Sequence, residues 1–198
     1  DLIDLTIAEV ERDFAFLGQY GNAGDYDSTG IAGDFGVTIL NSRDHADPLL
    51  NPLVTRVLVG GTAANAEQPG GLYGISSTID VGNFSMDDIV LAVLDQAAAD
   101  ANAVPISPTA SVLNAAADLL ALTISHEAGH SFGLRHTERN PFPLNRRVSI
   151  IDGGVDVLQD LGVGPDGIYG TLDDVRVDFI DDRYEPGEGY IGIARVTD

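Results

Sequence analysis

Hydrophobic and polar positions alternate along the first half of the chain with the periods of helices and strands. From Thr6 to Leu17, apolar residues recur every three or four positions, which predicts an amphipathic helix capped by Thr6 and closed by Gly18. Clusters of Val, Leu and Ile predict strands over Phe35–Leu40 and Thr55–Val59. The chain therefore begins with a helix that is followed by strands.

The middle of the chain adds a further strand and a long helix. A short alternating pattern with Gly and Ser over Tyr73–Val81 suits the edge of a sheet. The apolar segment Asp88–Gln96 fits either a helix or a strand, and we favour a helix because it runs into three alanines. A long helical pattern then begins at Ser111 and continues into a cluster of histidines that starts at His126. Together these elements predict an α+β fold.

After His136 the sequence becomes rich in Gly, Asp and Pro and carries few helical or strand patterns. A length of 198 residues suits one domain. We therefore expect a single domain over residues 1–198, divided into a larger upper part (1–133) and a smaller, irregular lower part (134–198). We expect it to be a monomer, and a longer multidomain parent chain stays open as an alternative.

The charge balance excludes several classes of partner. The chain has 31 acidic and 10 basic residues, a net charge of −21. Such a polyanion repels phosphate backbones and anionic lipid surfaces, so a nucleic-acid partner is disfavoured. No segment approaches the ~18 consecutive apolar residues that a membrane span requires.

The choice among charged and sulfur-containing residues bears on the compartment. All ten basic residues are Arg, and only seven of the acids are Glu, so Asp dominates. Asp-rich turns suit calcium-rich extracellular surroundings, with solvated surface charge in a salt-adapted organism as the alternative. Cys is absent, which excludes disulfides and thiolate metal sites. No charged-then-apolar leader is present, so we expect a secreted protein whose signal was removed or a piece of a longer chain.

Three of the four histidines lie within eleven residues, in the pattern H-E-x-x-H-x-x-G-x-x-H. Residues four apart on a helix lie on one face, about 6 Å along its axis, so His126 and His130 can bind one ion. Glu127 then lies beside that ion, where it can accept a proton from water. Gly133 can end the helix in a left-handed turn and return His136 to the same ion. Three His ligands are typical of a catalytic zinc site with one open position.

This motif resembles that of the metzincin clan of zinc metallopeptidases. The resemblance implies a zincin-like fold: a twisted mixed sheet and two long helices above a cleft, with a small irregular C-terminal subdomain below it. It implies that His126, His130 and His136 are the zinc ligands and that Glu127 is the general base. It also implies that an extended polypeptide substrate pairs with the edge strand, within Tyr73–Val81.

One feature departs from the clan, which is named for a methionine turn beneath the metal. The only methionine, Met86, precedes the motif by forty residues. The best-placed segment for that turn is Ser149–Gly154, with Ile151 where methionine is expected. A buried Ile can supply the same apolar floor, so we interpret this as a substitution.

A second group of acidic residues lies in the Gly- and Asp-rich tail. Asp166, Asp173, Asp174 and Asp178 alternate with glycines, and carboxylates on tight turns are typical calcium ligands. The spacing is not that of an EF-hand, and a solvated acidic loop is the alternative to a Ca²⁺ site.

The sequence favours a zinc-dependent endopeptidase, a secreted hydrolase that uses metal-activated water and Glu127. One alternative is a calcium-stabilised adhesion or recognition module with a relic zinc site. Another is a zinc hydrolase that acts on a non-peptide amide or ester.

Overall fold

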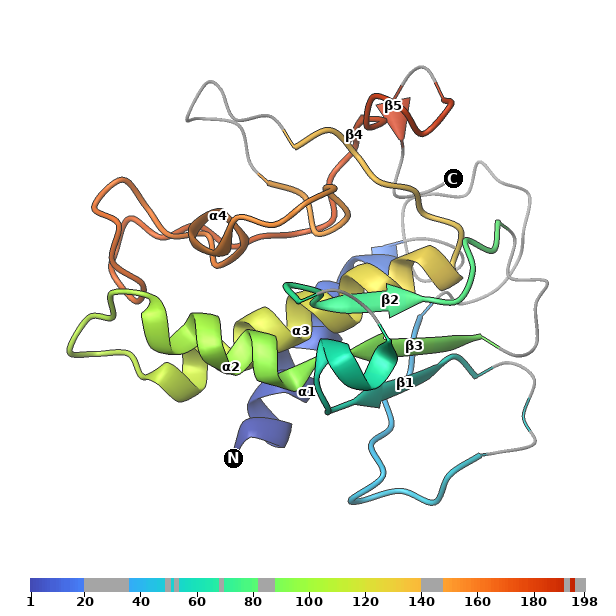
Figure 1. Cartoon of the computed structure of the whole chain (residues 1–198), viewed down its shortest axis with the longest axis horizontal. Coiled ribbons are helices and arrows are strands. Elements are labelled where there is room, and N and C mark those ends of the chain that lie inside the picture. Colours follow the sequence, from blue (N-terminus) through green and yellow to red (C-terminus); the bar gives the residue numbers. More distant parts are fainter. Residues whose placement is uncertain are drawn as a thin grey trace.

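The computed structural model describes most of the chain, namely residues 1–19, 36–48, 51, 54–67, 70–81, 88–139, 148–190 and 193–194. Within these ranges the protein has the predicted α+β character, with a small three-stranded mixed sheet beside helices. Figure 1 shows the long helix α3 (Val112–Ser131) at the centre, with the sheet and the orange-to-red C-terminal segment on opposite sides of it. No helix in these ranges is long and apolar enough to cross a membrane.

The first helix, α1 (Leu2–Asp13), starts earlier than the sequence pattern predicted. Asp1 caps it, because the Asp1 side chain accepts a hydrogen bond from the Asp4 backbone while Asp4 bonds back to Asp1. Thr6, the predicted cap, is instead an interior position of α1, and its side chain is buried. The helix also ends earlier, and a 3₁₀ turn, η1 (Ala15–Gln19), follows it.

The sheet has the order β1-β3-β2. Strand β1 (Arg56–Val59) pairs in parallel with β3 (Ile89–Ala92), and β2 (Gly74–Ser76) pairs with β3 in antiparallel fashion. The predictions of a strand at 55–59 and of an edge strand within 73–81 are therefore confirmed. The strand predicted at 35–40 is wrong for its described part, because residues 36–40 form no strand.

The preference for a helix over Asp88–Gln96 is also wrong. Its first half is the central strand β3, and helix α2 (Leu94–Ala103) begins only afterwards. Burial alternates along β3, where Val90 and Ala92 are fully buried and Ile89 is exposed, as a pleated strand with one covered face requires.

Helix α3 has the predicted start, because the Ser111 side chain accepts a hydrogen bond from the Asn114 backbone. Small side chains let α2 and α3 approach closely: Ala97 and Ala101 share a buried cluster with Ala115 and Leu119. A second cluster joins α1 and the last turns of α3 to the C-terminal segment. It contains Val10, Phe14, Ala121, Ala128, Ile150, Ile151 and Phe179.

Within its described residues (148–190 and 193–194), the C-terminal segment carries only short elements. They are α4 (Val157–Asp160), β4 (Asp182–Arg183) and β5 (Ile193–Ala194), and the last two pair with each other in antiparallel fashion. A further 3₁₀ turn, η2 (Ala63–Ala66), follows β1. The C-terminal segment is held to α3 by the second cluster.

Candidate metal centre

Three imidazole rings converge at the end of α3. His126 and His130 project from successive turns of the helix, and His136 reaches the same point from the loop beyond it. The Nε2 atom of His126 lies 3.2 Å from those of His130 and His136, and the last two atoms are 3.1 Å apart. The structure therefore brings together the three residues that the sequence predicted as ligands.

Hydrogen-bond partners behind the rings fix which nitrogen faces this point. The Nδ1 atom of His126 lies 2.7 Å from the Ile150 carbonyl oxygen, and that of His130 lies 2.8 Å from the Leu134 carbonyl oxygen. A carbonyl only accepts, so Nδ1 carries the hydrogen in both rings and Nε2 keeps its lone pair. Burial, and then the neighbouring His130, lowers the pKa of His126 to about 3, so this ring is neutral at pH 7.

Gly133 makes the turn that the motif predicted. Its φ of +94° lies in the left-handed region, and its N–H donates to the His130 carbonyl at 2.9 Å. A side chain here would also collide with the Val81 backbone, whose Cα atom would lie 2.7 Å from the added Cβ. The same turn brings the Leu134 carbonyl to His130, so it orients the second ring as well as returning the third.

The segment Ser149–Gly154 lies against the helix at the histidines. Ile151 is only 2% exposed, and its Cδ1 atom would lie 3.3 Å from a Cβ atom added to Gly129, which is in the helix between the first two histidines. The Thr137 hydroxyl donates to Asp152 at 2.5 Å, and the Thr137 N–H donates to the Ile151 carbonyl at 3.1 Å. This turn is therefore attached directly to the residue that follows His136.

Glu127 is buried between α3 and strand β2. A Cβ atom added to Gly74 would lie 2.6 Å from Glu127 Cγ and 2.8 Å from Thr123 Cγ2, so the strand passes the helix without room for a side chain. Burial raises the pKa of Glu127 to about 7, and a backbone hydrogen bond from Ser76 opposes this rise. A carboxyl group with this pKa can exchange a proton in either direction near neutral pH.

The donor set fits a zinc ion. Two ligands about 2.05 Å from a tetrahedral zinc lie about 3.3 Å apart, and the three Nε2 atoms are separated by 3.1–3.2 Å. Without a cation, three converging lone pairs repel one another. Among the described residues, no carboxylate or further imidazole joins this group of three. Three nitrogen donors with an open position are typical of catalytic zinc sites.

The acidic tail gathers three of its four predicted calcium ligands. The carboxylates of Asp166, Asp173 and Asp174 lie within 4.8 Å of one another. Asp178 lies elsewhere, because its carboxylate is 2.9 Å from Nε of Arg176 and forms an ion pair with it. The four residues therefore do not form one site.

The three gathered carboxylates bond to their own loop. Asp166 accepts a hydrogen bond from the Ile168 N–H at 2.8 Å, and Asp174 accepts one from the Gly170 N–H at 2.6 Å. Asp173 accepts one from the Asp166 N–H at 3.3 Å. These bonds account for the acidic residues as turn-forming groups, so a calcium ion stays an untested prediction.

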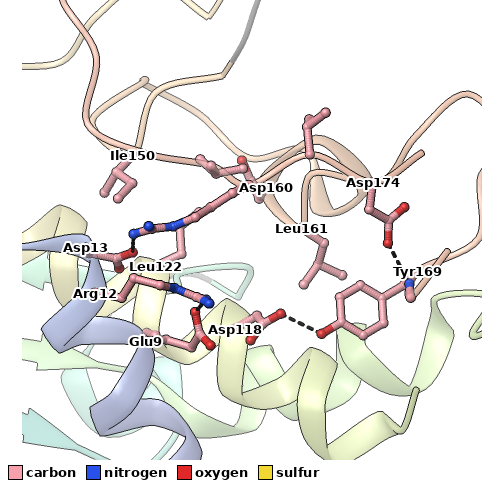
Figure 2. Close-up of a pocket in the computed structure, with 15 residues that line it drawn as sticks. Glu9, Arg12, Asp13, Asp118, Leu122, Ile150, Asp160, Leu161, Tyr169 and Asp174 are labelled. Carbon is pink, nitrogen blue, oxygen red and sulfur yellow. Dashed lines mark hydrogen bonds and ion pairs between the residues drawn. The ribbon is translucent and has the colours of Figure 1, made fainter. Parts of the chain in front are cut away.

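A cavity of about 270 Å³ lies between α1, α3 and the C-terminal segment, and none of its lining residues is a histidine (Figure 2). Figure 2 shows Asp118 facing Tyr169, whose hydroxyl donates to it at 2.5 Å. Asp13 accepts a hydrogen bond from Ser125 at 2.7 Å and one from Arg176 at 3.3 Å. Burial raises the pKa of Asp118. The Tyr169–Asp118 and Arg176–Asp13 pairs join the C-terminal segment to the two helices, and the Ser125–Asp13 bond joins the helices to each other.

Sequence reasoning missed the groups that hold the rings in place. The Ile150 and Leu134 carbonyls are backbone atoms, which leave no signature in a residue pattern. The carboxylates of Glu185 and Glu188 lie beside His136, about fifty residues further along the chain. In the sequence, the Gly- and Asp-rich composition of the tail was the signal that drew attention to this part of the chain.

Comparisons with protein-family models, with curated proteins and with solved structures found no significant match. The chemistry of the site is therefore what points to a function. The two features that bear on it most directly are the converging rings of His126, His130 and His136 and the buried carboxyl group of Glu127.

Proposed function

We propose that this chain is a zinc-dependent endopeptidase of metzincin type. The observation that carries the proposal is the convergence of three Nε2 atoms at 3.1–3.2 Å, with the buried Glu127 on the same helix. An accidental cluster of histidines on a helix would not also explain the Gly133 turn and the two carbonyls that orient the rings. The proposal is supported because the three rings, the turn and the two carbonyls are all arranged to suit one ion.

In this proposal His126, His130 and His136 hold the zinc ion. Zinc supplies Lewis acidity, which polarises a carbonyl group and lowers the pKa of water towards about 7. Glu127 supplies the proton transfer: its carboxylate accepts a proton from the attacking water and then delivers it to the leaving amine nitrogen. The pKa of about 7 belongs to the metal-free chain; a zinc ion beside Glu127 would lower it and favour the carboxylate, which is the form that accepts the proton.

The substrate we propose is an extended polypeptide. Strand β2 is at the edge of its sheet, and within the described residues only β3 pairs with it. An extended peptide can add to such an edge through main-chain hydrogen bonds. Gly74 and Ser76 of this strand contact Glu127, so a peptide paired here would run past the group that moves the proton.

The same proposal covers the finer features of the fold. We infer a zincin-like division into an upper subdomain (1–133) and a lower subdomain (134–198), with the cleft along β2 and α3. Ile151, buried beneath α3, would replace the methionine of the clan. A secreted location and a monomeric state belong to the proposal, and the Asp-rich composition is consistent with that location, whereas the absence of Cys leaves the compartment open.

The test is hydrolysis of a denatured protein by the purified chain, with and without a zinc-selective chelator. We expect chelator-sensitive cleavage in the wild type. Glu127→Ala should keep its zinc on metal analysis but lose activity by at least about 100-fold. Glu11→Ala, an exposed position on α1, is the matched control and should cleave normally.

Other outcomes distinguish the alternatives. Full activity in Glu127→Ala would contradict the proton-transfer role. Activity confined to small amides or esters would favour a non-peptide hydrolase. A chain that binds a protein in the presence of calcium but never cleaves it would favour the recognition module.

A further inference from the structure

The third histidine differs from the other two in the group that holds it. His126 and His130 each direct Nδ1 to a backbone carbonyl oxygen. The Nδ1 atom of His136 instead lies 3.2 Å from Oε1 of Glu188 and 3.5 Å from Oε2 of Glu185. His136 is also the one ligand that lies outside α3, so its orientation depends on contacts beyond the helix.

Glu188 is the better held of the two carboxylates. Its side chain is 21% exposed, whereas that of Glu185 is 41% exposed. The other oxygen of Glu188 lies 3.9 Å from Nη1 of Arg135, and the Arg135 guanidinium stacks over the Tyr190 ring at 4.2 Å. One carboxylate oxygen of Glu188 therefore faces the Arg135 guanidinium, and the other oxygen faces the His136 ring.

Backbone hydrogen bonds hold residues 185–188, here called the strap, against the third histidine. The Glu185 N–H donates to the His136 carbonyl at 3.0 Å, and the Glu188 N–H donates to the Glu185 carbonyl at 3.2 Å. Glu185 also packs on the turn beneath the helix, because a side chain at Gly153 would collide with its carboxylate. The two acids thus have different neighbours: Glu185 contacts the turn, and Glu188 lies between Arg135 and the ring.

We propose that Glu188 is a positioning residue, which accepts the Nδ1–H of His136 and thereby aims its Nε2 atom at the metal. This inference rests on the proposed zinc site. A carboxylate behind a ligating imidazole fixes the tautomer and the ring plane, and it makes the metal-facing nitrogen more basic. Glu188 therefore raises the affinity of the site for zinc without contacting the ion or the substrate.

The experiment measures zinc affinity in the full chain by competition with a chromophoric chelator. Loss of a partner of this kind weakens metal binding about 10- to 100-fold, and we expect a loss of that size in Glu188→Ala. Glu188→Gln keeps an oxygen acceptor and should lose less. Glu185→Gln, the matched control on the same strap, should stay within about twofold of the wild type.

Two further readouts separate positioning from a general loss of structure. Urea unfolding of the chelated proteins should give similar free energies for the wild type and both Glu188 variants, because the role depends on the metal. With Co²⁺ in place of zinc, the visible absorption bands should shift in Glu188→Ala and be largely restored in Glu188→Gln, since these bands report ligand geometry.

Several results would overturn the inference. Unchanged zinc affinity in Glu188→Ala would do so, and so would a larger loss in Glu185→Gln than in Glu188→Gln. Two zinc ions per wild-type chain, falling to one in Glu188→Ala, would make the carboxylates ligands themselves. A wild type that binds no zinc would overturn the proposed function as well, so the two failures are distinguishable.

Discussion

The buried carboxyl group of Glu127 should stabilise the metal-free protein at acid pH, and this one contribution should be lost as the pH rises through neutrality. Its pKa is about 7 in the folded chain, against an ordinary value of 4.5, because burial disfavours the charged form. Since the folded pKa is the higher one, the stabilisation is fully present below about pH 4.5 and is lost as the pH rises through 7. The difference between these two pKa values corresponds to about 3 kcal/mol of unfolding free energy.

The assay compares the wild type with Glu127→Gln, which has a similar size and cannot ionise. Urea unfolding is followed by far-UV circular dichroism in the presence of a chelator, from pH 4.5 to pH 8. The unfolding free energy of Glu127→Gln minus that of the wild type should grow by about 3 kcal/mol from pH 4.5 to pH 8. Glu11→Gln removes an exposed carboxylate from α1 and should show no comparable growth.

Parallel curves for the wild type and Glu127→Gln would refute this reasoning. They would mean that the folded protein solvates the Glu127 carboxylate as well as water does. If Glu127→Gln instead lost stability relative to the wild type as the pH rose, the effect would have the opposite sign to the one expected. That result would indicate that the ionised Glu127 carboxylate has a favourable partner. Either result would also remove the pKa argument for proton exchange near neutral pH.

Substitutions at two further positions test the turns around the histidines. Gly133→Ala should lower the unfolding free energy by about 1–3 kcal/mol and weaken zinc binding, because the residue has a positive φ and faces the Val81 backbone. Urea unfolding and chelator competition measure these effects, with Gly18→Ala, which has open space around it, as the control. Ile151→Ala should cost about 2–5 kcal/mol, whereas Ile151→Met should cost less than about 1.5 kcal/mol and keep the zinc affinity; a severe loss in the Met variant would contradict the proposed replacement.

Local sequence signals predicted the helix that carries the site. Ser111 caps α3, the apolar run continues without Gly or Pro for more than four turns, and Gly133 follows at the point where the helix has ended. The relative positions of His126 and His130 could therefore be predicted, because their spacing within one helix places both on the same face. The fold around this helix depended on less local information.

The central strand shows why the rest was harder to predict. Ile89–Ala92 is uniformly apolar and leads straight into alanines, so its local pattern also fits a helix. Its strand conformation is set by β1 on one side and β2 on the other, and the β1 partner lies more than thirty residues away. Similarly, the start of α1 was predicted too late because Asp1 and Asp4 form a cap that competes with Thr6.

The site itself is shared between the two parts of the chain. The helix supplies two rings, but the Ile150 carbonyl behind His126 and the carboxylate of Glu188 behind His136 both belong to the C-terminal segment. The three Nε2 atoms can therefore converge only when that segment is docked against α3. An ion bound by all three rings stabilises the docked arrangement over any undocked one, by an amount that grows with the logarithm of the metal concentration. A segment whose described residues form only short helices and strands would gain order from such an ion.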